Sequence, residues 1–118
     1  MEPQQFVAGH PLGLSVFHRV RSIVDEIGGV DARISKSQVA FRRKHGFAYL
    51  WMPGQYLAEP AVDVVLSIPL GRHEQSGRFK QVVHPSPKHW MHHLEVRDVG
   101  EIDDQVAAWL REAAGRAG

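Results

Sequence analysis

The chain has 118 residues, of which 43% are hydrophobic and 23% charged, a composition typical of one globular domain rather than of a disordered chain. Its formal net charge of +1 excludes a strong overall field that would attract nucleic acid or membranes. The absence of cysteine excludes disulfides, thiol chemistry and cysteine-based zinc sites, and it suits a cytoplasmic location.

The first third of the chain predicts an arm followed by a helix. Residues 1–12 are rich in proline and glycine, which predicts a loose arm before a single α+β domain over residues 13–118. Hydrophobic residues from Val16 to Ile27 then recur at the spacing of one helical face. Ser15 is expected to cap this helix, and Gly28-Gly29 is expected to end it.

The hydrophobic period then changes from 3.6 to 2, which is typical of strands. Strands are predicted at residues 32–35, 38–42, 47–52, 62–70, 79–83 and 90–97. Gly46 is expected to take a positive φ in a turn, and Pro69 to mark where the chain leaves the sheet. Residues 71–78 are predicted to form a polar loop, and residues 84–89 a turn.

A second helix is predicted over residues 98–115, at the end of the chain. Asp98 and Glu101 have the spacing of a capping box, and Asp103 and Asp104 are expected in the first turn. The fold class is therefore predicted as α+β, with a mainly antiparallel sheet of five or six strands and the two helices packed on one face. The predicted core comprises Phe17, Val20, Val24, Ile27, Leu50, Val64, Leu66, Val106 and Leu110.

A basic and aromatic segment over residues 36–52 is the strongest candidate for a binding surface. Its candidate residues for an anion or a nucleic acid are Lys36, Arg42, Arg43, Lys44, Tyr49 and Trp51. Because side chains alternate along a strand, Arg42 and Lys44 should share one face and Arg43 the other. The competing interpretation is an edge strand whose charges prevent aggregation.

Histidines are frequent near the end of the chain, but their spacing argues against a metal site. His92 and His93 are adjacent on a predicted strand and should point to opposite faces. We therefore predict no metal; if one were bound, its ligands would be His89, His93 and Glu95. No serine has the surroundings of a nucleophile, so no catalytic residue is predicted. Trp90 and Trp109 are predicted to be core residues.

Three segments resemble a known family. They are Lys-Ser-Gln-Val-Ala-Phe-Arg-Arg-Lys-His-Gly-Phe-Ala, Trp-Met-His-His-Leu-Glu-Val and Asp-Asp-Gln-Val-Ala-Ala-Trp-Leu-Arg-Glu-Ala. They resemble a family of small bacterial domains of unknown function, related to the YdhG-like domains, some of whose members are labelled predicted transport protein. The resemblance implies an α+β fold and no established activity. A weaker resemblance to MmcQ/YjbR-type proteins implies a DNA-binding wing that carries Lys36 and residues 42–44.

These observations favour a binding module without enzymatic activity or cofactor, whose partner is a small anionic ligand or a protein. The alternative is a nucleic-acid-binding wing that uses the segment 36–52, and the third hypothesis is a metal-dependent enzyme. The protein is expected to be a monomer or a homodimer in the cytoplasm, with no membrane segment.

Overall fold

The computed structural model describes residues 2–118, which form helices at the two ends of the chain and strands between them. The helices are α1 (Pro3–Phe6), α2 (Pro11–Ile27) and α3 (Asp104–Ala117), with two 3-10 turns, η1 (Pro53–Gln55) and η2 (Val99–Glu101). The strands are β1 (Asp31–Ile34), β2 (Val39–Arg42), β3 (Gly46–Trp51), β4 (Val64–Leu70), β5 (Gln81–Ser86) and β6 (His89–Val96). Among these residues, no helix is long and apolar enough to cross a membrane.

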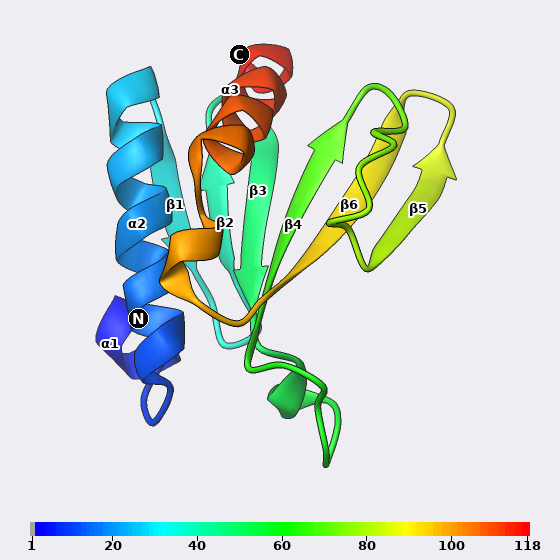
Figure 1. Ribbon diagram of the computed structural model, residues 1–118. Coiled ribbons are helices and arrows are strands. Elements are labelled where there is room, and N and C mark those ends of the chain that lie inside the picture. Colours follow the sequence, from blue (N-terminus) through cyan, green and yellow to red (C-terminus); the bar gives the residue numbers. More distant parts are fainter. Residues whose placement is uncertain (1) are drawn as a thin grey trace.

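The strands form one open sheet in the order β1-β2-β3-β4-β6-β5, and every neighbouring pair is antiparallel. Helices α2 and α3 lie on the same face of this sheet (Figure 1). The predicted α+β class with an antiparallel sheet is therefore confirmed. The opposite face has no helix over it among the residues described, and we call it the open face.

Between the helices and the sheet lies a hydrophobic core that matches the predicted one closely. Phe17 of α2 stacks on Phe41 of β2 with ring centroids 6.0 Å apart. Of the nine predicted core residues only Ile27, at the end of α2, is half-buried; the buried ones are Phe17, Val20, Val24, Leu50, Val64, Leu66, Val106 and Leu110. The change of period from 3.6 to 2 thus identified the side chains that meet in the core.

The start of α2 differs from the prediction. The helix begins at Pro11, and Ser15, which was expected to cap it, lies inside it. Proline fits the first helical position because that position needs no intrahelical N–H bond, and its fixed φ favours the helix. Upstream of it, in the segment predicted as an arm, α1 forms and Phe6 and Val7 are buried against the core.

At the other end of the chain, the predicted capping box is present but belongs to a different element. Asp98 accepts the Gly100 N–H at 2.7 Å, and Glu101 accepts the Asp98 N–H at 2.9 Å, so the box encloses η2. Asp103 then caps α3 by accepting the Val106 N–H at 3.1 Å, whereas a place inside the first turn was predicted. Asp104 does occupy that first turn.

The connection between β4 and β5 covers the part of the sheet that the helices leave free on their own side (Figure 1). Arg72 forms two hydrogen bonds to Glu112 of α3, at 2.8 and 2.9 Å. The Trp109 indole N–H donates to Glu74 at 3.2 Å, which lowers the pKa of that carboxyl. The loop predicted from its polar composition is therefore attached to α3 by side-chain contacts.

Two strand boundaries also differ from the prediction. The predicted turn over residues 84–89 is shorter, because β5 continues to Ser86 and β6 begins at His89. A register irregularity between Val83 and Ser86 accommodates the proline in this stretch. Pro69 does not end β4; it lies inside the strand, opposite Met91 of β6.

Candidate ligand-binding cleft

The sheet divides along the junction of β3 and β4. The two strands share three residue pairs, from Tyr49 opposite Ser67 to Trp51 opposite Val65, whereas β4 and β6 share seven. Pro69 lies in the part of β4 that is paired only with β6, and it has no N–H to offer a strand on the β3 side. The two strands diverge beyond this point (Figure 1).

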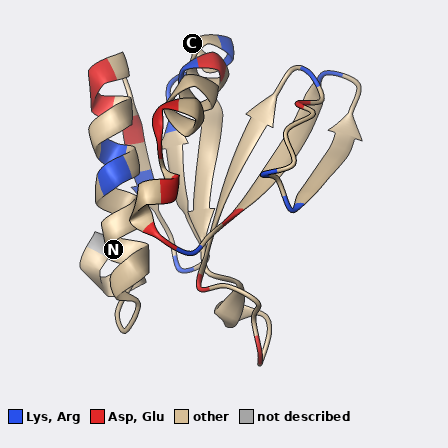
Figure 2. Cartoon of the chain, viewed as in Figure 1, with Lys and Arg blue, Asp and Glu red and all other residues tan. Residues whose placement is uncertain are grey.

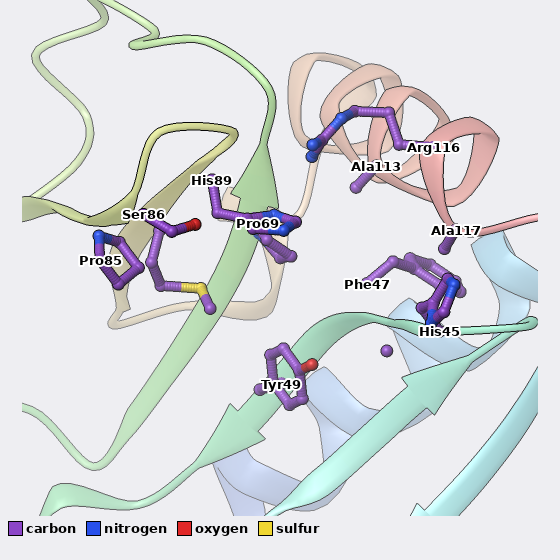
Figure 3. A pocket seen from close by; sticks show the side chains of 12 residues that line it. His45, Phe47, Tyr49, Pro69, Pro85, Ser86, His89, Ala113, Arg116 and Ala117 are labelled. Atoms are coloured by element: carbon purple, nitrogen blue, oxygen red, sulfur yellow. The ribbon is translucent and has the colours of Figure 1, made fainter.

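A cleft of about 580 Å³ occupies this divergence. Figure 3 shows Phe47 and Tyr49 of β3 on one side of it, and Pro69 and His89 opposite them. Arg116 extends from α3 across its upper edge in the same view. The volume lies within the range of roughly 300–1,000 Å³ that is usual for small-molecule sites.

The polar groups that line the cleft are neutral or basic. Arg116 donates one hydrogen bond to the Lys88 carbonyl at 2.8 Å and forms no ion pair within residues 2–118. His45, His89 and Tyr49 add ring nitrogens and a hydroxyl group, and no carboxylate lines the cleft. A guanidinium has five N–H donors, so Arg116 retains donors for a ligand.

Figure 2 shows how charge is divided along α3. Its C-terminal end and the neighbouring β5–β6 turn are basic, whereas η2 and the start of the helix are acidic. A helix of 14 residues is about 21 Å long. The acidic residues of η2 and of the helix start therefore lie about two Debye lengths away from Arg116 and exert little repulsion on an anion bound to it.

Groups of the β2–β3 hairpin donate hydrogen bonds to carbonyl groups at the C-terminal end of α3. Arg43 donates to the Ala114 carbonyl at 3.3 Å, and the His45 backbone N–H donates to the Ala117 carbonyl at 3.0 Å. Carbonyl groups at a helix C-terminus carry a partial negative charge that would oppose a bound anion. Arg43 offsets this charge and holds the hairpin in place.

Tyr49 separates the cleft from a second, shallower groove. This groove has a volume of about 410 Å³ and is lined by Arg33, Arg42 and Gln38 together with Tyr49. Gly46 lies beneath the Tyr49 ring, and a Cβ there would overlap the hydroxyl group. The expected positive φ at Gly46 is wrong, since positive φ among glycines occurs only at positions 9, 28 and 29 of the described chain. Glycine is needed here for close approach instead.

The candidate binding residues of the segment 36–52 do not form one surface. Lys36 lies in the β1–β2 turn and Lys44 in the β2–β3 turn, at opposite ends of β2. Arg42 faces the shallow groove beside Tyr49, whereas Arg43 contacts α3, as the strand alternation predicts. Trp51 lies further along β3, beside Ser67 and His93.

His92 and His93 point to opposite faces, as predicted. His92 is fully buried; its Nδ1 lies 3.2 Å from the Ile68 carbonyl, and its Nε2 accepts the Glu74 N–H at 3.0 Å. Burial lowers the pKa of His92, which keeps the ring neutral with its proton on Nδ1. This histidine fastens the β4–β5 loop to the sheet and has no free nitrogen for a metal.

The fold separates the three residues that were named as ligands in case a metal is bound. His89 lines the cleft, while His93 and Glu95 line a different hollow on the open face. In the described part of the chain, no three His, Cys, Asp or Glu side chains are arranged to hold a metal ion.

The tryptophans have different surroundings. Trp109 is buried, as predicted. Trp90 is only half-buried, and its ring is stacked between His84, with centroids 3.6 Å apart, and His73, at 5.1 Å. Neither histidine has a spacing from Trp90 along the chain that would place it beside Trp90 on one helix or one strand. The sequence alone therefore did not indicate this stack.

A hydrogen-bonded chain on the open face was also absent from the sequence analysis. The Trp51 indole N–H donates to the Ser67 hydroxyl at 2.9 Å, and that hydroxyl lies 2.6 Å from His93 Nδ1. The three residues come from three neighbouring strands. Only the strand order and register bring them together, although the alternation of β4 does place Ser67 on the opposite face from Leu66 and Ile68.

Together, the fold and the cleft define a small α+β domain with a ligand-sized hollow where its open sheet divides. The family model described as Domain of unknown function (DUF5655) matches residues 5–114, and the chain belongs to this family. This confirms the coarser part of the resemblance, that to a small domain of unknown function. No curated protein matches the chain, and no solved structure does.

Proposed function

We propose that this domain is a binding module for a small organic anion, which it holds in the cleft between β3 and β4. The observation that carries the proposal is the lining of the cleft, which has Arg116 and two histidines but no carboxylate. Hydrogen bonds from a guanidinium to a carboxylate or a phosphate are charge-assisted and roughly twice as strong as neutral ones.

The remaining walls favour a ligand that also has an apolar part. Phe47 and Pro69 are buried, Met91 is half-buried, and all three line the cleft. A small ligand site usually combines such apolar walls with a few polar groups that orient the ligand. An aromatic or branched acid, or a phosphate ester of an apolar alcohol, has both features.

Arg116 is the residue whose replacement tests this proposal. Isothermal titration of the purified protein with phenyl phosphate and benzoate should give saturable binding, and benzyl alcohol should bind at least about tenfold more weakly. Arg116→Gln should remove the preference for the anions. Arg111→Gln, which alters an exposed arginine on the same helix, is the matched control and should retain it.

The proposal fails if the anions and the alcohol bind equally, or if Arg116→Gln and Arg111→Gln behave alike. Thermal denaturation of both variants shows whether either change has disturbed the fold. Arg116 is exposed and at the last turn of α3, so both variants should remain folded.

The nucleic-acid hypothesis is the second candidate, supported by the shallow groove. Arg33 and Arg42 line it next to the Tyr49 ring and form no ion pair within residues 2–118. If single-stranded nucleic acid binds there, Arg42→Ala should reduce the slope of log K against log salt by about one unit. Arg43→Ala should leave the slope unchanged, because Arg43 contacts α3.

The remaining proposals come from the sequence. A metal-dependent enzyme was predicted to use His89, His93 and Glu95, of which the fold leaves His93 and Glu95 together; stoichiometric metal in the purified protein that is lost in the His93→Ala variant would support it. The relation to YdhG-like domains and the transport label, a cytoplasmic location, and a monomeric or homodimeric state are likewise proposals. Sedimentation analysis decides the last of these directly.

A further inference from the structure

A third, smaller hollow lies on the open face beside the hydrogen-bonded chain of Trp51, Ser67 and His93. Its volume is about 210 Å³, which is below the range of roughly 300–1,000 Å³ that suits drug-sized ligands. Its lining includes Trp51, His93 and Glu95, and it shares no lining residue with the large cleft. It is therefore a separate site, sized for a smaller molecule.

The hydrogen-bonded chain fixes the position of the proton on His93. An indole N–H can only donate, and His93 Nδ1 is the one acceptor within residues 2–118 for the proton of the Ser67 hydroxyl, so we assign that hydroxyl as accepting from Trp51 and donating to Nδ1. The proton of the neutral imidazole must then be on Nε2. Burial lowers the pKa of His93, which favours this neutral form.

The Nε2–H group of His93 has no partner within residues 2–118, yet it is not sealed from solvent. None of its hydrogen bonds involves Nε2, and no fully buried side-chain nitrogen or oxygen there lacks a partner. The ring is thus held by Ser67 on one side and presents an oriented donor on the other, in the lining of the hollow.

Two residues of opposite charge, Lys80 and Glu95, line the same hollow as His93. Lys80 is exposed and forms no ion pair in the described chain. Glu95 is paired with Arg97 at 3.3 Å, and its side chain is 19% exposed. The hollow therefore offers a cation and an N–H donor for one group, and a largely covered carboxylate for another.

The other walls are apolar, and one of them is exposed. Trp51 and Val65 line the hollow from the sheet, and Leu57 lines it from the loop after η1. Leu57 is 57% exposed and the neighbouring Tyr56 is 64% exposed, which makes them the most exposed large hydrophobic residues described. A bound apolar group would cover part of this surface.

We propose that this hollow binds a free α-amino acid with an apolar side chain. The carboxylate of the amino acid accepts hydrogen bonds from His93 Nε2 and Lys80, and its ammonium group faces Glu95. The side chain lies against Trp51 and Leu57. The donor and the cation together match the carboxylate of such a molecule, Glu95 matches its ammonium group, and the apolar wall matches its side chain.

Titration of the full chain with leucine and three analogues tests the assignment. Leucine should bind saturably, whereas N-acetyl-leucine lacks the ammonium group, leucinamide lacks the carboxylate and glycine lacks the side chain. Each analogue should bind at least about tenfold more weakly, the loss expected for one charge-assisted or apolar contact. In parallel, the Nε2–H resonance of His93 should shift with leucine and saturate at the same concentration.

Variants assign each end of the ligand. Glu95→Gln should abolish the preference for leucine over N-acetyl-leucine. Lys80→Met should weaken the binding of leucine several-fold, which corresponds to the loss of one exposed charge contact. Lys88→Met, in the β5–β6 turn, is the matched control and should bind leucine normally. Arg116→Gln should also leave leucine binding unchanged, which separates this site from the large cleft.

Three results would overturn the assignment. One is the absence of saturable leucine binding to the folded wild-type protein at tens of millimolar, a concentration at which one or two such contacts give occupancy. Another is equal binding of leucine and leucinamide. The third is a stable dimer that Leu57→Ser dissociates, because the exposed wall would then be a subunit contact.

Discussion

Replacing Ser67 by alanine is the most direct test of the hydrogen-bonded chain on the open face. Ser67 is 3% exposed and joins Trp51 of β3 to His93 of β6, so its hydroxyl links three strands. Ser67→Ala removes two hydrogen bonds, each worth about 1 kcal/mol net. Trp51 and His93 are half-buried, so water can reach the groups that lose their partner, and no further penalty for buried unpaired groups is added. We therefore expect a loss of about 2 kcal/mol in the free energy of unfolding.

Urea denaturation of the variant and of a control measures this loss. Ser22→Ala alters an exposed serine on α2 and should change the stability by less than about 0.5 kcal/mol. Trp51→Phe, alone and combined with Ser67→Ala, completes a double-mutant cycle whose coupling energy should be about 1 kcal/mol. The hydrogen bonds of Ser67 also predict the tautomer of His93, which the imidazole nitrogen spectrum reports. His93 should hold its proton on Nε2 in the wild type and lose this preference in Ser67→Ala.

The reasoning about Ser67 is refuted if Ser67→Ala costs no more than the Ser22 control and the imidazole nitrogen spectrum of His93 is unchanged. A large cost with an unchanged spectrum would mean that Ser67 is needed for packing and does not orient the histidine.

The remaining predictions concern pH, the core and Gly46. Burial lowers the pKa of His92 and His93 in the folded state, so the unfolded chain takes up more protons than the folded one as the pH falls below about 6.5. The free energy of unfolding should therefore be largest above that pH and fall below it, by at most about 1.4 kcal/mol per pH unit for each histidine. Equal stability in chemical denaturation at pH 7.5 and at pH 5 would contradict this. Leu110→Ala should cost about 2–5 kcal/mol because Leu110 is fully buried, whereas Leu57→Ala, at a leucine 57% exposed, should cost far less by the same measurement. Gly46→Ala should cost about 1–3 kcal/mol in the wild type but much less in a Tyr49→Ala background, where the overlapping ring is absent; equal costs in the two backgrounds would show that space is not the reason for this glycine.

The sequence predicted those features of the fold that depend on neighbours along the chain. The faces of α2 and α3, the strands and the opposite orientations of His92 and His93 follow from local periodicity. Errors occurred where two neighbouring signals competed. Ser15 was expected to cap the helix, but the helix begins at Pro11, in the segment predicted as an arm. The box of Asp98 and Glu101 is present but encloses a short 3-10 turn.

The candidate sites were harder to predict, because they depend on how distant strands pair. The order β4-β6-β5 places the last strand between two earlier ones, and this order alone brings His93 to Ser67. Likewise, Arg116 was not singled out, because nothing near it in the sequence indicates that the last turn of α3 lies over a divided sheet. The hairpin residues that were singled out are instead spread over separate places: two turns, the groove beside Tyr49, the end of α3 and the neighbourhood of Ser67.

The division of the sheet is maintained by contacts that hold its two halves to the same helix. The β2–β3 hairpin is attached to the end of α3 through Arg43 and His45, while the β4–β5 loop is attached through Arg72 and Glu112. If β3 and β4 paired along their full length, the sheet would gain further backbone hydrogen bonds, each worth about 1 kcal/mol net.

Pro69 has no N–H to contribute to such pairing, and the attachments of both halves to α3 oppose the approach of β3 to β4. The cleft is consequently present before any ligand binds, and its apolar walls and its arginine do not have to be assembled on binding. A preformed site of this kind loses little affinity to conformational ordering. On this argument, weakening the hairpin's attachment with Arg43→Met should reduce affinity for an anion in the cleft, even though Arg43 does not line it.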